Sequence, residues 1–123
     1  MTLGLIHGAT PQAMVMVHKP GMPNHDFDHR PDVRFPIAKL PDFIRIHEAV
    51  AGMVAPSKVV AIALNTMLYP DEAEAKRVID QVAAETGLPA DDPVRFGADR
   101  LWRAIHDGVD ALPWVAGALP VLG

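Results

Sequence analysis

Two short, unbroken runs of apolar residues constrain the fold of this chain more than any other feature. They occupy residues 13–17 and 59–64, and neither alternates apolar with polar side chains. A strand that is covered by helices on both faces has this pattern, whereas a strand with one face in water alternates. The two runs therefore predict buried strands of a parallel sheet.

The clearest helical pattern covers residues 71–86. Pro70 and Asp71 open this helix, and Gly87 with Pro89 closes it. The apolar residues recur at the spacing of one helix face, which predicts that this face is buried. These residues are Ala75, Val78, Ile79 and Val82.

Weaker patterns predict the remaining elements. Helices are expected over residues 42–54 and 98–106, and residues 2–7 read as the end of another. A third strand is expected over residues 93–96. The side chains expected to face the core are Phe43, Ile46, Val50, Met53 and Val54 in the first helix, and Leu101, Trp102 and Ile105 in the second, which Gly108 would end.

This alternation of strands and helices predicts an α/β fold, a three-layer parallel sheet with flanking helices. Half of the 123 residues are hydrophobic and 21% are charged, which excludes a disordered chain. The net charge of −4 argues against a nucleic-acid partner, and the lack of cysteine excludes disulfides and thiolate zinc sites. The longest apolar stretch, residues 111–122, is too short for a membrane span, so we expect a cytoplasmic protein with no membrane partner.

Three polar segments follow the predicted strands, and ligands bind beyond the carboxyl ends of parallel strands. These segments are residues 18–21, residues 65–66 and residues 92–97. Lys19 and Arg95 suit an anionic group, because one presents a point charge and the other a planar fork. The amide of Asn65 suits another amide or the edge of a nucleobase.

Simpler interpretations of the same residues stay open. Asn65 and Thr66 can instead cap a turn, and Arg95 can pair with Asp92 or Asp99. The segment at residues 25–29 carries two histidines and two aspartates, but it lacks the fixed helical scaffold that gives such spacing meaning. We expect it to be a solvated polar loop and predict no metal.

Several common catalytic motifs are absent from the sequence. It contains no Gly-x-x-x-x-Gly-Lys-Ser/Thr phosphate loop, no Gly-x-Gly-x-x-Gly and no Gly-x-Ser-x-Gly, and Ser57 is its only serine. The prediction is that this chain supplies only part of a binding site.

Four short motifs occur in an order that resembles a known family. They are Thr-Leu-Gly-Leu-Ile-His-Gly-Ala-Thr-Pro at 2–11, His-Lys-Pro-Gly at 18–21, Leu-Asn-Thr at 64–66 and Asp-Pro-Val-Arg-Phe-Gly at 92–97. Together they resemble the C-terminal domain of the D-glutamate N-acetyltransferase-like family (DgcN-type proteins). The resemblance implies a partial P-loop NTPase-like domain of the dethiobiotin-synthetase kind over residues 1–108, with residues 109–123 as an apolar tail outside the pattern.

The resemblance also implies an activity and a site. The activity is acetyl transfer from acetyl-CoA to the amino group of D-glutamate, in D-amino-acid catabolism. By strand position, His18 and Lys19 would lie beside the phosphates or the acceptor carboxylate, with His18 as the base. Asn65 and Thr66 would lie where related folds read a nucleobase, and the stretch from Asp92 to Arg95 where they line the adenosine or the substrate.

The family pattern normally continues upstream of this start, with a phosphate loop and an N-terminal domain. The expectation is a fragment, a mis-started reading frame or a remnant that needs the missing upstream domain or forms a homo-oligomer. Two alternatives to the transferase stay open: a non-catalytic remnant or interaction module, and an ATP-binding P-loop-type relative.

Overall fold

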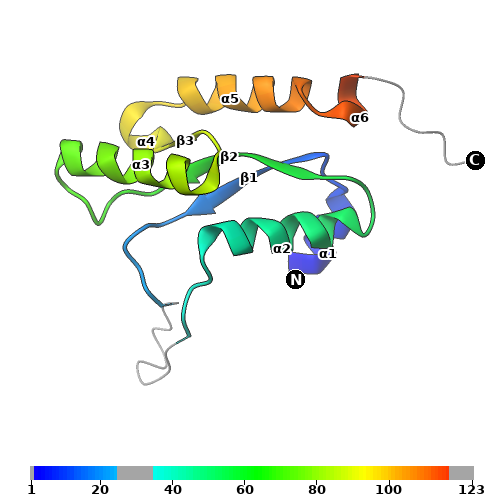
Figure 1. Ribbon diagram of the computed structural model, residues 1–123, viewed down its shortest axis with the longest axis horizontal. Coiled ribbons are helices and arrows are strands. Elements are labelled where there is room, and N and C mark those ends of the chain that lie inside the picture. Colours follow the sequence, from blue (N-terminus) through cyan, green and yellow to red (C-terminus); the bar gives the residue numbers. More distant parts are fainter. Residues whose placement is uncertain (1, 25–34, 117–123) are drawn as a thin grey trace, which may run out of the picture.

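The computed structural model describes residues 2–24 and 35–116, which form a three-stranded parallel sheet with helices on both sides (Figure 1). The strands are β1 (Ala13–His18), β2 (Lys58–Leu64) and β3 (Ala90–Asp91), and β2 lies in the middle. Both apolar runs are therefore strands, as predicted.

The helices form the two outer layers of the predicted three-layer α/β fold. Helices α2 and α3 pack on one face of the sheet with α1 against α2, and α5 packs on the other face (Figure 1). None of the helices in the described ranges is long and apolar enough to cross a membrane. The helices are α1 (Thr2–Ala9), α2 (Leu40–Gly52), α3 (Glu72–Thr86), α4 (Pro93–Phe96), α5 (Asp99–Asp110) and α6 (Pro113–Ala116).

The third strand was predicted in the wrong place. Residues 93–96 form helix α4, and the strand is the residue pair just before it. The Asp92 carboxylate accepts the N–H groups of Val94 and Arg95, which caps a helix start. Pro93 then occupies the first helical position, where its missing N–H costs nothing.

Strand β2 is buried on both faces because it is the central strand and has helices on each side, and a register shift decides which of its residues face which layer. Met14 pairs with Val59, whereas the next residue of β1 pairs with Ala61, so Val60 is skipped. This irregularity places Val59 and Ile62 together in the core beneath α2 and α3. Val60 instead packs against α5 on the opposite face.

Strand β1 is buried on one face only, so the prediction of burial on both faces is wrong for this strand. Met16 lies in the core at 7% exposure, whereas Val17 is 75% exposed and Val15 is 38% exposed. Helix α5 packs over β2 and leaves this part of the sheet open.

The predicted buried faces of two helices are also partly wrong. In α2 the buried residues are Leu40, Ile44 and Ala51, and the half-buried Phe43 packs against the same core as predicted, so the inner face is rotated from the expected one. Ile46, Met53 and Val54 are exposed instead. In α5 Leu101 is buried, whereas Trp102 is 63% exposed and its ring meets the ring of His106 edge to face at 4.7 Å.

Gly108 does not end helix α5, which continues to Asp110. A Cβ atom at this position would lie 2.7 Å from the Cβ of Val60. The glycine therefore allows α5 to approach β2 closely.

We expect Gly108→Ala to lower the free energy of unfolding by about 1–3 kcal/mol, because the new methyl group overpacks the α5–β2 contact. Alanine is the better helix former by roughly 1 kcal/mol, so the expected loss runs against helix propensity. Urea unfolding followed by circular dichroism measures the change.

Gly52→Ala is the matched control, because Gly52 ends α2 and an added Cβ there meets no atom within 4 Å. This variant should keep or raise the stability. A Gly108→Ala variant as stable as Gly52→Ala would contradict the close packing of α5.

Candidate functional site

The three polar segments predicted to share one edge of the sheet do lie together, at the carboxyl ends of the strands. The backbone carbonyl of His18, at the end of β1, accepts the N–H of Asn65 at 2.9 Å. The residue after Asn65 is in turn hydrogen-bonded to the residue that follows β3. We call this edge the rim, and it comprises residues 18–21, 65–70 and 92–95.

Asp92 is the most heavily bonded side chain of the rim. Its Oδ2 accepts the hydroxyl of Thr66 at 2.7 Å and the N–H of Thr66 at 2.9 Å. Its Oδ1 accepts the N–H groups of Val94 and Arg95, each at 3.1 Å. Asp92 is 4% exposed and Thr66 is fully buried. This carboxylate joins the end of β2 to the start of α4.

Burial alone would raise the pKa of Asp92, but the hydrogen bonds reverse the shift. The hydroxyl and N–H of Thr66 and the N–H groups of Arg95 and Val94 stabilise the charged form, so the pKa lies below its ordinary value. Asp92 is therefore a carboxylate at neutral pH, with both oxygens occupied by the protein.

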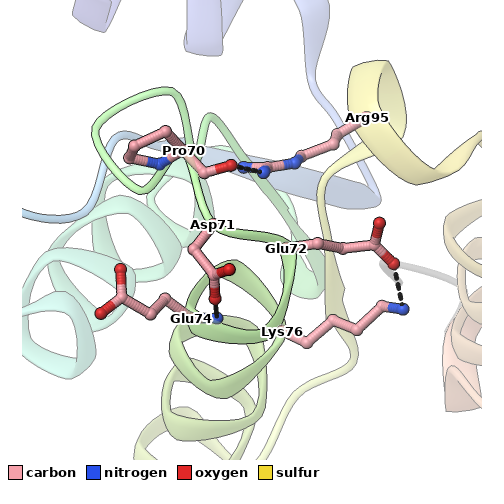
Figure 2. A network of polar contacts seen from close by, with 6 residues as sticks. All are labelled: Pro70, Asp71, Glu72, Glu74, Lys76 and Arg95. Atoms are coloured by element: carbon pink, nitrogen blue, oxygen red, sulfur yellow. Dashed lines mark hydrogen bonds and ion pairs between the residues drawn. The ribbon is translucent and has the colours of Figure 1, made fainter.

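The Arg95 guanidinium holds the loop after β2. It donates to the carbonyl of Tyr69 at 2.5 Å and to the carbonyl of Pro70, and it lies 3.5 Å from the hydroxyl of Thr66. Figure 2 shows it directed at Pro70, above the start of α3. The alternative of an ion pair with Asp92 or Asp99 is wrong, because no such pair forms between these described residues.

The start of α3 below Arg95 carries its own polar contacts (Figure 2). Asp71 lies just before the helix and caps it, since its carboxylate accepts the N–H of Glu74 at 2.9 Å. Lys76 donates to Glu72 at 2.6 Å, and this hydrogen bond, with the charge of Lys76, lowers the pKa of Glu72. The start of α3 is therefore fixed by the Asp71 cap, next to the carbonyl of Pro70 that Arg95 holds.

Asn65 is exposed and caps a turn. Its Oδ1 accepts the N–H of Met67 at 3.1 Å, which is the simpler of the two interpretations left open for this side chain. Its side-chain amide has no further hydrogen bond within the described part of the chain and can still donate to a ligand.

His18 and Lys19 are both half-buried at the end of β1. Burial lowers the pKa of the His18 imidazole below its ordinary value, and the negative charge of Glu85 opposes this without cancelling it. The ring is therefore largely neutral at pH 7. Lys19 forms no ion pair with any described residue, so its ammonium is available to an anion.

Tyr69 connects two segments of the rim, and sequence reasoning missed it. A Cβ on Gly21 would lie 3.0 Å from the Tyr69 hydroxyl oxygen, and Gly21 has a φ of +91°, which favours glycine. The chain after β1 thus packs against this ring, while the Tyr69 carbonyl accepts Arg95. The Pro-Gly pair was the one sequence signal of a tight turn here.

The long loop after β1 is closed at its base. Asn24 pairs with Pro36 across it, and the N–H of Ile37 donates to the carbonyl of Pro23 at 3.1 Å. The proposed polar loop at residues 25–29 lies outside the described residues.

The comparison with protein families decides the affiliation of this chain. A family model described as "Domain of unknown function (DUF1611_C) P-loop domain" matches residues 1–102. The chain belongs to the DUF1611 family. A DUF1611 family protein from Anabaena variabilis, known from its crystal structure, is 46% identical with a TM-score of 0.74 over 86% of this chain. This likeness agrees with the predicted P-loop-like α/β fold and with the resemblance read from the motifs.

A curated relative of this DUF1611 chain carries an enzyme name. The D-glutamate N-acetyltransferase of Tritonibacter scottomollicae is 32% identical in an alignment 114 residues long, and the match covers 85% of this chain. The match covers 30% of that enzyme, and also 30% of the Anabaena protein. The chain thus spans less than a third of the length of either relative.

We expect Asp92→Asn to lower the free energy of unfolding by about 1.5–3 kcal/mol at pH 7, because two Thr66 donors lose their charged acceptor. The pKa of Asp92 is lower in the folded state than the value of about 3.9 for an unfolded chain. The stabilisation is therefore complete above the unfolded value and is lost as the pH falls through the folded value.

Urea unfolding between pH 7 and pH 2 measures this effect. The difference in the free energy of unfolding between wild type and Asp92→Asn should shrink as the pH is lowered. Asp110→Asn, which removes an exposed carboxylate at the end of α5, is the matched control. A gap that stays constant with pH would contradict the role assigned to the Asp92 charge.

Proposed function

We propose that this chain is the C-terminal part of an acetyl-CoA-dependent N-acetyltransferase that acts on D-glutamate, in D-amino-acid catabolism. The observation that carries the proposal is the 32% identity to a D-glutamate N-acetyltransferase over most of the chain. The composition of the rim supports it, because a half-buried histidine and a half-buried lysine follow one another in the sequence at the end of β1.

His18 is the proposed general base. Acetyl transfer to an amine requires loss of a proton from the ammonium form, so that nitrogen can attack the thioester carbonyl. The lowered pKa leaves the His18 ring neutral at pH 7 and able to accept that proton. His18 releases this first proton to solvent, takes the second proton of the attacking nitrogen as the C–N bond forms, and gives it to the sulfur as the C–S bond breaks. Acetyl-CoA supplies the thioester when it is bound.

Lys19 is the proposed anion-binding residue. Its ammonium has no ion pair among the described residues and lies next to the base in the chain. A pyrophosphate of the acyl donor or a carboxylate of the acceptor fits such a charge. Asn65 adds a free amide donor just after the neighbouring strand β2.

Thr66, Asp92 and Arg95 are proposed to act through position rather than contact. The Asp92 oxygens and the Arg95 donors are directed at protein atoms. Their effect is to hold the ends of β2 and β3 in place, so that a ligand meets a rigid rim.

The open face of β1 indicates how the site is completed. Val15 and Val17 are exposed on this strand, and β1 has no strand partner on its outer side within the described residues. Parallel sheets are normally covered on both faces. We propose that further polypeptide, from the same protein or from a second copy, covers this face and supplies the rest of the pocket.

A second candidate is an ATP-binding protein, which the P-loop description of the family favours. An ATP-dependent enzyme needs donors for a triphosphate, and Lys19 suits that group as well. The two functions differ in their requirement for ATP, which makes them separable in one assay.

The test is a chimera of the Tritonibacter enzyme in which this chain replaces the matching segment. We expect release of free CoA thiol that requires D-glutamate and proceeds without ATP. His18→Gln should lower kcat by about 10²–10⁴ and leave KM nearly unchanged, as removal of a general base does. As the pH is lowered, kcat/KM should fall with a midpoint below about pH 6.5, the ordinary pKa of histidine, because the pKa of His18 is lowered.

His106→Gln is the matched control, since it removes an exposed imidazole on α5 away from the rim. It should leave kcat unchanged. A folded chimera without turnover would overturn the proposal, and turnover that requires ATP would favour the second candidate.

The same chimera tests the lysine. Lys19→Gln should raise KM for acetyl-CoA or for D-glutamate by about tenfold or more with a smaller effect on kcat, because an anion contact is lost. Equal KM values for both substrates in wild type and variant would remove Lys19 from the site.

A further inference from the structure

A hollow lies beside β3, which is the edge strand of the sheet opposite β1. Its volume is about 370 Å³, within the range of about 300–1,000 Å³ typical of small-molecule sites. It is formed where α3, β3, α4 and α5 meet. We call it the β3 hollow, and its lining residues are Lys76, Ile79, Asp80, Asp91, Phe96 and Arg100.

Asp91 is the buried polar group of the β3 hollow. It is 7% exposed, and its Oδ1 accepts the N–H of Asp92 at 2.9 Å. Its Oδ2 has no hydrogen-bond partner among the described residues and is not sealed off from solvent. A buried carboxylate is stabilised when each oxygen accepts a hydrogen bond, so the second oxygen of Asp91 favours a ligand that brings a hydrogen-bond donor.

The charges around Asp91 are of both signs and come from different elements. Asp80 of α3 and Arg100 of α5 are exposed, and neither side chain forms a hydrogen bond or ion pair with the described residues. Lys76 is held by Glu72 and lies 5.2 Å from the centre of the Phe96 ring. The β3 hollow is therefore lined by negative and positive groups that form no ion pair with the described residues.

The remaining surface of the β3 hollow is apolar. Ile79 is 2% exposed and belongs to the core, and the half-buried ring of Phe96 packs against the same core. A ligand here meets an aliphatic and an aromatic side chain between the charged groups. A metal ion does not match these features, because the described residues contain no group of three or more potential metal ligands.

We propose that the β3 hollow binds a small α-amino acid as its zwitterion, with the ammonium group against Asp91 and Asp80 and the carboxylate against Arg100. A guanidinium and a carboxylate form two parallel hydrogen bonds, which fixes the orientation of the ligand. A short aliphatic side chain then lies on Ile79 and Phe96. This proposal does not depend on acetyl transfer, since binding is measured without acetyl-CoA.

The experiment follows backbone amide resonances of the ¹⁵N-labelled 123-residue chain during titration with norvaline, as separate L and D forms. Pentanoate lacks the ammonium group and 1-aminobutane lacks the carboxylate, so each removes one half of the recognition. We expect saturable shifts at the lining residues with one form of norvaline, and affinity lower by about tenfold or more for each half-ligand.

Asp91→Asn keeps an oxygen for the N–H of Asp92 but removes the charge, and it should weaken norvaline binding by about tenfold or more. Asp107→Asn removes an exposed carboxylate from α5 outside the hollow and should bind as wild type does. If Asp91→Asn does not fold, Arg100→Gln at an exposed position makes the same test.

Three results would each overturn the proposal. They are the lack of saturable shifts with both forms of norvaline, equal affinity for norvaline and a half-ligand, and equal affinity of the hollow variant and Asp107→Asn. Because no acetyl-CoA is present, a negative result here leaves the transferase proposal to its own assay.

Discussion

The contact between Thr66 and Asp92 is the interaction on which the arrangement of the rim depends. Strand β3 has two residues, so its backbone pairing with β2 is too short to fix the segment after it. The Asp92 carboxylate makes up for this, because it holds Thr66 with one oxygen and starts α4 with the other. A charged acceptor buried among four N–H and O–H donors contributes more than a neutral one. Arg95 extends the same connection to the loop before α3.

The two aspartates at the end of β3 have opposite surroundings. Asp92 faces the rim with both oxygens satisfied by the protein, whereas Asp91 lines the hollow with one oxygen unused. Neighbouring residues of a strand point to opposite sides, so one short segment serves two surfaces. The same side chain chemistry is thus structural at one position and available to a ligand at the next.

Much of the fold follows from local sequence signals. The runs at 59–64 and 71–86 are long, strongly patterned and well bounded, so β2, α3, the Asp71 cap and the Gly87 end were all predictable. The short strand β3 could not be predicted, because two residues are too few to show a hydrophobic pattern. The pair Asp92-Pro93 is also as typical of a turn before a strand as of the helix start that it forms. Trp102 and Ile46 were misplaced because burial depends on which helix face meets the sheet. The rim was predictable as a place, since parallel strands end together, but Tyr69 and the partners of Arg95 depend on the three-dimensional path of a loop.

Because Gly108 and Val60 are in contact, the space between α5 and β2 limits the combined volume of the two residues at these positions. Val60 is skipped in the pairing of β2 with β1, and its branched side chain packs against α5. Gly108 has no side chain, and this leaves room for Val60. A larger residue at 108 requires a smaller one at 60, or an α5 displaced from the sheet, because close-packed interiors leave no spare space. Evolution of this layer is therefore expected to proceed by paired exchange at two sites that lie 48 positions apart in the chain.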